Sequence, residues 1–490
     1  MTAIEKSAGA SSAKGDNFKA IAWPRARREV RRLQVRIAKA VREGRHGKVK
    51  SLQWLLTHSF SGKVLAVKRV VSNRGRKTPG VDGVIWSTPK QKMKAVHNLR
   101  RCGYKALALR RVYVPKKNSK KMRPLNIPTM HDRAQQALHA LALQPVAETK
   151  ADPNSYGFRP YRQCADAIQQ CFNSLARRHS PRWVLEGDIK ACFDEINHDW
   201  LLENIPMDKL MLSKWLKAGY FEGGKLYPTN SGTPQGGIIS PVLANLTLDG
   251  MEAAIKAVVP RRSKVNIIRY ADDFVVTGNS KEILEDPIRP VVVDFLKIRG
   301  LTLSHEKTRI TTIEDGFDFL GQNLRKYKGK LLITPARNNV KAFLAKVRKT
   351  IRKFAAKKTG DMIRTLNPII RGWANFHRHV VASNTFKKAD NQIYCYLKDW
   401  AKRRHPEKGK RWVTRKYWLS APKAWIFSAE EKTPEGKRRV ELIRASSIGI
   451  KRHIKVRCEA NPFDPKDDKY FKDRKAGERF RYKVSAVKAA

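Results

Sequence analysis

Acidic residues, paired cysteines and long apolar runs are all scarce in this sequence. Its 490 residues include 43 Asp and Glu against 102 Lys and Arg, so the formal net charge is +59. A charge of this size predicts a polyanionic partner, either nucleic acid or an acidic membrane surface. No apolar run approaches the roughly 18 residues of a membrane-spanning helix, and no early stretch is typical of a signal peptide. We therefore expect nucleic acid, and no membrane, as the partner.

The cysteines are few and scattered. There are six of them, and no two form a C-x-x-C pair. A disulfide framework is improbable in a chain of this length, and no zinc cluster of ordinary spacing can be assembled. Because 41% of the residues are hydrophobic, the chain also has enough apolar material for a large core. The composition therefore predicts a folded, intracellular protein of several domains.

Arginines crowd a helix that we predict between residues 25 and 45. Apolar residues recur there at helical spacing, and five arginines, Arg28 and Arg32 among them, fill the rest of its surface. A solvated helix face is the simplest interpretation, but five neighbouring guanidinium groups repel one another. A phosphate-bearing partner is therefore favoured.

A second basic region follows residue 335, where the pattern becomes helical. Lys349, Arg352 and Lys353 surround the apolar face of a helix predicted over residues 340–354. From residue 325 to the end, about 46 basic residues stand against about 14 acidic ones, a net of about +32 out of +59. This third of the chain is therefore predicted to form a large surface for RNA or DNA.

The middle of the chain has a mixed α/β pattern with two predicted hairpins. Residues 111–115 and 122–127 are typical of paired strands around a basic turn. A strand over residues 184–189 reaches Asp188, and the hydrophobic segment 265–276 is broken by Asp272 and Asp273. The second hairpin should therefore carry acids at its bend.

These carboxylates interrupt otherwise hydrophobic strands. Neighbouring carboxylates repel one another and destabilise the fold unless a cation neutralises them. Three carboxylates from adjacent strands suit two Mg²⁺ ions about 3.5–4 Å apart, the arrangement used for in-line phosphoryl transfer. A Y-x-D-D string by itself is weak evidence, since it also fits a capped turn.

Three sequence blocks occur in the order and approximate spacing of a polymerase palm. They are D-I-K-A-C-F (188–193), G-T-P-Q-G-G (232–237) and Y-A-D-D (270–273). With these blocks the sequence resembles the group II intron reverse transcriptases, or intron-encoded maturases. The resemblance covers about residues 25–475 and includes T-P-G-V-D-G (78–83), R-P-L-N-I-P (123–128), S-Y-G-F-R-P (155–160), G-L-T-L-S-H-E-K-T (300–308) and F-L-G (319–321). Downstream, R-G-W-A-N-F (371–376) is similar to the maturase (domain X) signature.

The resemblance implies an α+β right-hand polymerase, with fingers and palm, followed by an all-helical thumb and maturase domain. The implied divisions are a basic N-terminal extension (1–70), fingers and palm (71–330), thumb and maturase domain (331–425), and a basic DNA-binding tail (426–490).

The resemblance also assigns a polymerase site. Asp188, Asp272 and Asp273 would hold two Mg²⁺ ions, and the carbonyl of Ile189 would complete one coordination sphere. Phe193 would abut the sugar of the incoming nucleotide and exclude a 2′-hydroxyl, although without the motif it would be an ordinary core residue.

Further residues are implied for the substrates. Lys116 and Arg123 would clamp the triphosphate, and Gln235 would support the nucleotide. Lys307 and Arg159 are expected at the primer or template. The RNA-binding set comprises Arg28, Arg32, Lys349, Arg352, Lys353, Arg371 and Trp373. For Trp373, packing in the core is an equally open interpretation.

The implied activity is RNA-directed DNA synthesis, coupled to intron splicing and mobility (retrohoming). The implied partners are group II intron RNA, target DNA, a primer 3′-end and deoxynucleoside triphosphates, in a cytoplasmic setting that is prokaryotic or organellar. Three alternatives remain: an RNA-dependent RNA polymerase, an RNA-binding splicing factor with a vestigial palm, and a defence-type reverse transcriptase outside an intron. Because no C-x-x-C pair or His-Asn-His array follows Asp464, we expect no C-terminal HNH endonuclease.

Overall fold

The computed structural model describes residues 17–115, 122–421, 424–434 and 436–477. Helices make up most of the first hundred residues. They are α1 (Trp23–Arg42), α2 (His46–His58), α3 (Phe60–Ser72), the short 3₁₀ helix η2 (Arg74–Lys77) and α4 (Pro89–Asn98). The predicted helix over residues 25–45 is confirmed as α1, which buries Val30 and Ile37 against the core. Helices α1, α2 and α3 all pack on α5 (Met130–Lys150), which is buried along most of its length.

The predicted basic hairpin is also confirmed. Strands β1 (Leu109–Pro115) and β2 (Met122–Ile127) pair antiparallel, while the tip between them, which includes Lys116, lies outside the described residues. Strands β4 (Tyr220–Glu222) and β5 (Lys225–Tyr227) extend this sheet in the order β2-β1-β4-β5.

The palm is a sheet with the strand order β6-β7-β3-β8, with β9 paired to β3 as well. Its strands are β3 (Trp183–Lys190), β6 (Asn266–Tyr270), β7 (Asp273–Gly278), β8 (Thr302–Leu303) and β9 (Arg309–Thr312). The helices of this region are α6 (Cys164–Leu175), α7 (Cys192–Glu195), α8 (His198–Asn204), α9 (Lys209–Leu216), α10 (Ser240–Leu248), α11 (Met251–Ala257), η3 (Arg261–Ser263), α12 (Lys281–Ile283), η4 (Leu284–Ile288) and α13 (Arg289–Lys297). The strand predicted over 184–189 and the hairpin around residues 271–273 are thus both present.

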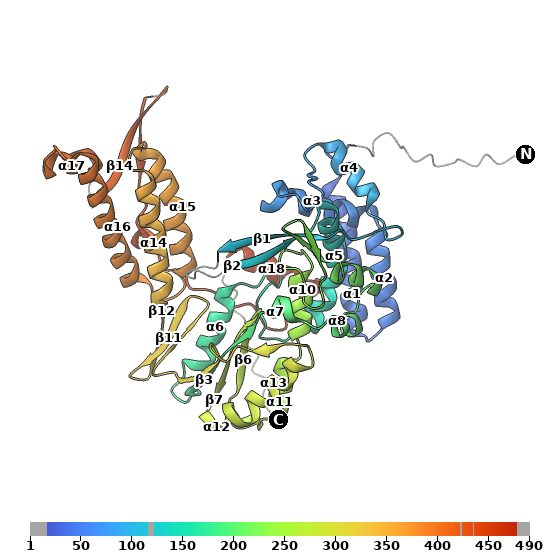
Figure 1. Cartoon of the computed structure of the whole chain (residues 1–490). Helices are drawn as coiled ribbons and strands as arrows, with labels where there is room; N and C mark the ends of the chain where they lie inside the picture. Colours follow the sequence, from blue (N-terminus) through green and yellow to red (C-terminus); the bar gives the residue numbers. More distant parts are fainter. Residues whose placement is uncertain (1–16, 116–121, 422–423, 435, 478–490) are drawn as a thin grey trace, which may run out of the picture.

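A meander of three strands leads from the palm to the thumb. It consists of β10 (Phe317–Phe319), β11 (Gln322–Tyr327) and β12 (Lys330–Pro335), and the helices α14 (Arg337–Lys353), α15 (Thr359–His377), α16 (Ser383–Arg404) and α17 (Lys410–Tyr417) follow. Figure 1 shows this helical layer on one side of the molecule, α1–α5 on the other, and β1 and β2 between them. The predicted helix over 340–354 is confirmed as α14.

The thumb helices carry a sheet that the sequence analysis did not anticipate. Strands β13 (Trp418–Ala421), β14 (Ala424–Thr433) and β15 (Gly436–Glu441) pair antiparallel and pack against α15 and α17. After η5 (Ala445–Ser447), which packs on α15 and α16, the chain returns toward α1 through η6 (Pro465–Asp467) and α18 (Asp468–Ala476). There Arg31 of α1 forms an ion pair with Asp468 at 2.6 Å, so the segment that ends in α18 is held against α1. No helix in the described ranges is long and apolar enough to cross a membrane.

Candidate active site

Three carboxylates meet at the end of the palm sheet. In the antiparallel pairing of β3 and β7, Asp188 lies directly opposite Asp273. Asp272 sits in the two-residue turn between β6 and β7, where Ala271 takes a left-handed backbone conformation with φ of 58°. Such tight hairpin turns need a residue with positive φ. The strand ends and the turn together therefore bring the three acids to one place.

Burial and mutual repulsion both oppose ionisation of these acids. Burial, followed by the charges of Asp272 and Asp188, raises the pKa of Asp273 to about 7, and burial also raises the pKa of Asp272. A neighbouring cation is already present, because Lys307 Nζ donates to Asp188 Oδ2 at 2.7 Å and this bond raises the pKa of Lys307. The site is therefore one that gains from positive charge.

The carboxylates of Asp188, Asp272 and Asp273 do not form a complete metal-binding site in this arrangement. Among the described residues, no three Asp, Glu, His or Cys side chains are gathered in a geometry that could hold a metal ion. One oxygen of Asp188 is bonded to Lys307, and Ile189 pairs with Leu303 of β8. The donor set, which consists of carboxylate and carbonyl oxygens, is nevertheless the kind that Mg²⁺ prefers.

The S-Y-G-F-R-P block (155–160) packs against the turn that carries Asp272. Tyr156 N donates to Arg269 O at 2.9 Å, which places the block along β6. A Cβ atom at Gly157 would collide with the backbone nitrogen of Ala271, so only glycine allows this approach. The block therefore fixes the backbone that carries Asp272.

Phe193 lies next to this block, on the short helix α7. Its ring is half-buried, and its centroid is 6.0 Å from that of Phe158, with the two planes at 79°. The glycine-rich loop 232–237 packs on α7, where Thr233 N donates to Phe193 O at 2.6 Å. Phe193 is thus held by a backbone hydrogen bond from the glycine-rich loop and by contact with the ring of Phe158.

The same loop joins α7 to the basic hairpin. Gln235 Nε2 donates to Asp194 Oδ2 at 2.6 Å, and Asn126 N of β2 donates to Gln235 O at 3.1 Å. Arg123, also on β2, is exposed, and its charge lowers the pKa of Asp272 against the larger effect of burial. The structure therefore brings Arg123 and Gln235 to the same side of the site as the carboxylates.

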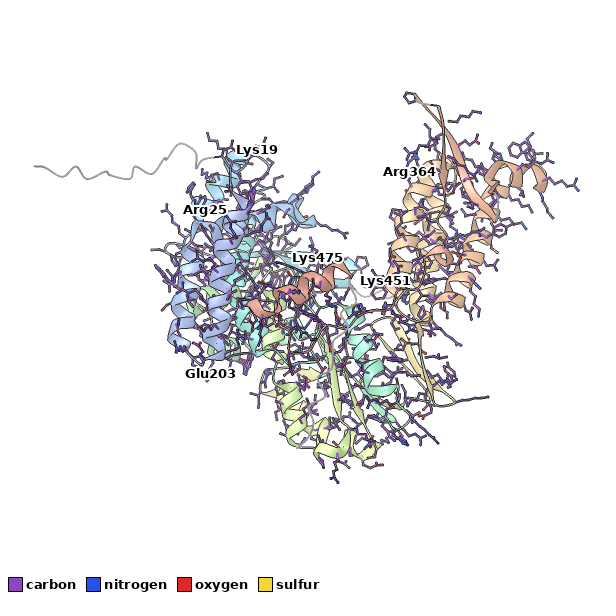
Figure 2. All side chains as sticks on the ribbon, turned by 180° about the vertical axis from the view of Figure 1, so that it is seen from behind. Lys19, Arg25, Glu203, Arg364, Lys451 and Lys475 are labelled. Carbon is purple, nitrogen blue, oxygen red and sulfur yellow. The ribbon has the colours of Figure 1, made fainter. Side chains whose placement is uncertain are left out.

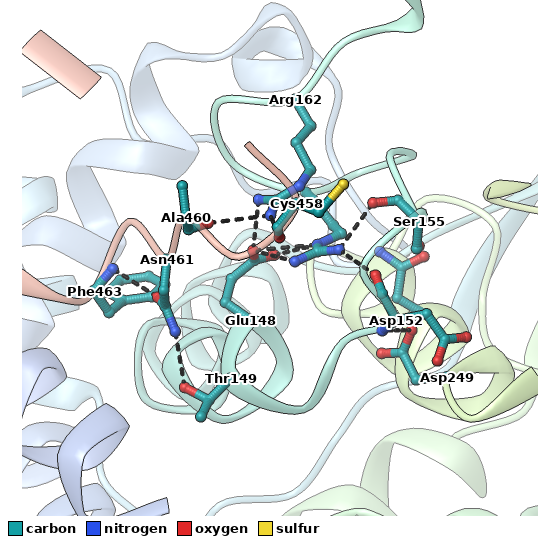
Figure 3. A network of polar contacts seen from close by, with 12 residues as sticks. Glu148, Thr149, Asp152, Ser155, Arg162, Asp249, Cys458, Ala460, Asn461 and Phe463 are labelled. Atoms are coloured by element: carbon teal, nitrogen blue, oxygen red, sulfur yellow. Dashed lines mark hydrogen bonds and ion pairs between the residues drawn. The ribbon is translucent and has the colours of Figure 1, made fainter. Parts of the chain in front are cut away.

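Arg159 is placed differently from our expectation of a primer or template contact. Its side chain is only 4% exposed, and its guanidinium donates to Glu148 Oε2 at 2.9 Å and to the carbonyls of Asp152 and Ser155. Glu148 also accepts from Arg162 at 3.1 Å and lies at the centre of this network (Figure 3). Because its donors are used within the buried core, Arg159 anchors the S-Y-G-F-R-P block and does not face a primer or template.

The residues expected to bind RNA form two groups. Those on the surface are Arg28, Arg32, Lys349, Arg352, Lys353 and Arg371, all of them exposed. Trp373, by contrast, is half-buried, stacks on Phe343 at 4.1 Å and donates to Asn339, so it packs the thumb. Figure 2 shows Arg25 and Arg364 on the two helical layers, with Lys451 and Lys475 between them.

Two residues at the site were missed by the sequence analysis. Asp194 holds the side chain of Gln235, and Phe158 contacts the ring of Phe193. Asp194 directly follows Phe193, and Phe158 belongs to a block that the resemblance already included. Their position beside recognised motif residues was the signal that could have identified them.

Comparison with known families matches three consecutive parts of the chain. Residues 18–99 match the N-terminal domain of reverse transcriptase, residues 114–324 match the reverse transcriptase (RNA-dependent DNA polymerase) family, and residues 340–418 match the group II intron maturase-specific domain. The chain belongs to the group II intron reverse transcriptases/maturases. Its enzymatic class is RNA-directed DNA polymerase. The expected boundary at residue 70 falls inside the matched N-terminal domain of this reverse transcriptase.

Individual proteins and one solved structure are also similar to parts of this chain. Protein YkfC of Escherichia coli (strain K12) is 33% identical over 311 residues, which cover 54% of this chain and 80% of that protein. The group II intron-encoded protein LtrA of Lactococcus lactis subsp. cremoris is 29% identical over 438 residues, which cover 69% of this chain and 71% of that protein. Among solved structures, a telomerase from Candida albicans aligns with a TM-score of 0.38 and 12% identity, covering 62% of this chain and 59% of that one.

Proposed function

We propose that this reverse transcriptase copies RNA into DNA at Asp188, Asp272 and Asp273, with two Mg²⁺ ions, and that its basic surfaces bind group II intron RNA to assist splicing and mobility. The observation that supports the site is the direct opposition of Asp188 and Asp273 across the strand pair. Burial, together with the charges of Asp272 and Asp188, raises the pKa of Asp273 to about 7. Two divalent cations would relieve this repulsion.

The metal ions, when bound, would lower the pKa of the primer 3′-hydroxyl and stabilise the departing pyrophosphate. Asp188, Asp272, Asp273 and the carbonyl of Ile189 would hold them. Lys307 pairs with Asp188, and its ammonium would have to leave that oxygen when the cation binds. Lys307 would then be available to the primer end.

The basic hairpin and the glycine-rich loop would bind the nucleotide. Arg123 on β2, together with Lys116 at the tip, would neutralise the triphosphate, and Gln235 would support the sugar and base. Phe193 would lie against C2′ of the sugar and thereby exclude ribonucleotides. The hydrogen bonds that fix Gln235 between α7 and β2 support this arrangement.

Intron RNA would bind by phosphate contacts on two helices. Arg28 and Arg32 project from α1, and Lys349, Arg352 and Lys353 project from α14. Structured RNA is recognised mainly through shape and backbone contacts, which suits such exposed cations. Target DNA and the primer 3′-end would complete the set of partners, with deoxynucleoside triphosphates as substrates.

The test of the active site is Asp272→Asn. This change removes a negative ligand without changing the size of the side chain, so it should abolish cDNA synthesis on a primed RNA template. Binding of intron RNA should be unchanged, because the basic helices lie elsewhere. Asp199→Asn, at an exposed position at the start of α8, is the matched control. Normal polymerisation by a folded Asp272→Asn protein would refute the assignment.

A second test concerns sugar selection. Phe193→Ala should open space beside the sugar and raise the ratio of kcat/KM for ribonucleotides to that for deoxynucleotides. If the ratio does not change, Phe193 is a packing residue and the proposed selection mechanism is wrong.

A further inference from the structure

The loop that follows Gly157 holds two large aromatic residues in a strained conformation. Phe158 and Tyr161 have φ of 57° and 61°, in the left-handed region that bulky side chains avoid. Both residues are also exposed, with 51% of the surface of Phe158 and 55% of that of Tyr161 accessible to solvent. Burial of apolar surface therefore does not explain why these two positions keep aromatic residues in an unfavourable backbone conformation. Strain of this kind is characteristic of functional sites.

The strained conformation is enforced by the residues between and beside the two rings. Arg159 and Arg162 both bind the buried carboxylate of Glu148. On the other side, Gly157 lies against Ala271 of the acidic turn. The backbone of Phe158 is therefore fixed at both ends, and its ring is presented outward from a rigid support.

The two rings face different neighbours. Phe158 contacts the ring of Phe193 edge to face, whereas the ring of Tyr161 packs on that of Phe471 of α18, with centroids 4.8 Å apart and planes tilted by 36°. Edge-to-face contact is a preferred geometry for aromatic pairs and defines the orientation of each ring. Phe193 itself lies on a helix of only four residues, and its half-buried side chain packs against the hydrophobic core as well as against Phe158.

We infer that Phe158 is a positioning residue for sugar selection: its ring holds Phe193 in the orientation that excludes a 2′-hydroxyl. This inference rests on the proposed role of Phe193. Phe158 acts through its contact with Phe193, and the strain at residue 158 is explained by the need to direct an aromatic ring at that point. Without this ring, the Phe193 side chain loses the edge-to-face contact that sets the orientation of its ring.

The test measures kcat/KM for a deoxynucleotide and for the matching ribonucleotide on a primed RNA template. Phe158→Gly is the main variant, because glycine accepts the left-handed conformation and should fold without strain. We expect it to raise the ribonucleotide-to-deoxynucleotide ratio several-fold, whereas Phe158→Tyr, which keeps the ring, should retain the wild-type ratio. Tyr161→Gly is the matched control, since it removes the other strained ring and should not change the ratio.

A double variant separates positioning from direct contact. If Phe158 acts through Phe193, the Phe158→Gly/Phe193→Ala protein should show the same ratio as Phe193→Ala alone. A further increase in the double variant would mean that Phe158 contacts the nucleotide itself, and would overturn the inference.

The single variants separate the two hypotheses. An altered ratio in Phe193→Ala with an unchanged ratio in Phe158→Gly would refute the positioning role and leave the proposed function intact. An unchanged ratio in both would refute the role of Phe193, and with it the role of Phe158. A general loss of activity in Phe158→Gly without a change in the ratio would show that the ring is only structural.

Discussion

Glu148 should be one of the most sensitive positions of the polymerase core. Its carboxylate is 4% exposed and accepts hydrogen bonds from Arg159 and Arg162, whose side chains are 4% and 1% exposed. Burial lowers the pKa of Arg162 to about 10 even with Glu148 present. Glu148→Gln keeps the shape of the side chain but leaves two buried guanidinium groups without their carboxylate.

Removing one partner of a buried ion pair destabilises a protein by about 3–5 kcal/mol. We expect a loss in this range for Glu148→Gln, because two cations share the one carboxylate. Since a chain of several domains need not unfold in a single step, the measurement is calorimetry, with the transition of the polymerase core compared between variants at one scan rate. The exposed pair of Glu285 with Lys281 supplies the control. Glu285→Gln should cost less than about 0.5 kcal/mol.

The functional consequence follows from the loop that Glu148 anchors. Loss of this anchor should loosen Gly157 and the turn that carries Asp272, so cDNA synthesis should fall at least tenfold at temperatures where the protein is still folded. RNA binding through α14 should persist. A Glu148→Gln protein with wild-type activity and a stability within about 1 kcal/mol of the wild type would refute this reasoning.

Three further predictions concern pH, metal binding and salt. Burial lowers the pKa of His139 to about 4, from 6.5 in the unfolded chain, so the unfolded state binds more protons between these values. Stability should therefore fall by about 2 kcal/mol from pH 7 to pH 5, and His139→Gln should remove this contribution in denaturation curves. Lys307→Gln should lower the Mg²⁺ concentration that gives half-maximal activity, because Lys307 competes for Asp188; an unchanged or higher value would contradict this. Neutralising three cations of α14 should reduce the slope of log K against log salt for intron RNA by about 2–3, as a titration of filter-binding affinity against KCl would show. The three cations are Lys349, Arg352 and Lys353.

Local patterns were sufficient to predict the elements that carry the candidate site residues. The strand ending at Asp188 and the hairpin around Asp272 follow from short hydrophobic runs that acids interrupt, and the structure has both. The basic faces of α1 and α14 follow from helical spacing. These features depend on residues close in sequence, and for that reason periodicity and motif order reveal them.

The role of Arg159 could not be predicted in the same way. An arginine in a motif block of a basic protein is expected to meet phosphate, and sequence alone does not show whether its side chain is buried. Here the partner is Glu148, on a helix that is buried along most of its length. The contact of Phe158 with Phe193 likewise joins positions 35 residues apart, on a loop and a helix with no shared pattern.

The most distant contacts explain why the C-terminal segment joins the core. The carboxylate of Asp166 is fully buried. His453, Arg474 and the backbone nitrogen of Val456, which are 287, 308 and 290 residues away in sequence, bind it. Arg162 donates to the carbonyl of Ala460 and also binds Glu148. The segment after β15 therefore completes the buried network that anchors the S-Y-G-F-R-P block. Its basic composition suggests only nucleic-acid binding, but its buried contacts also connect it, through that block, to the turn that carries Asp272.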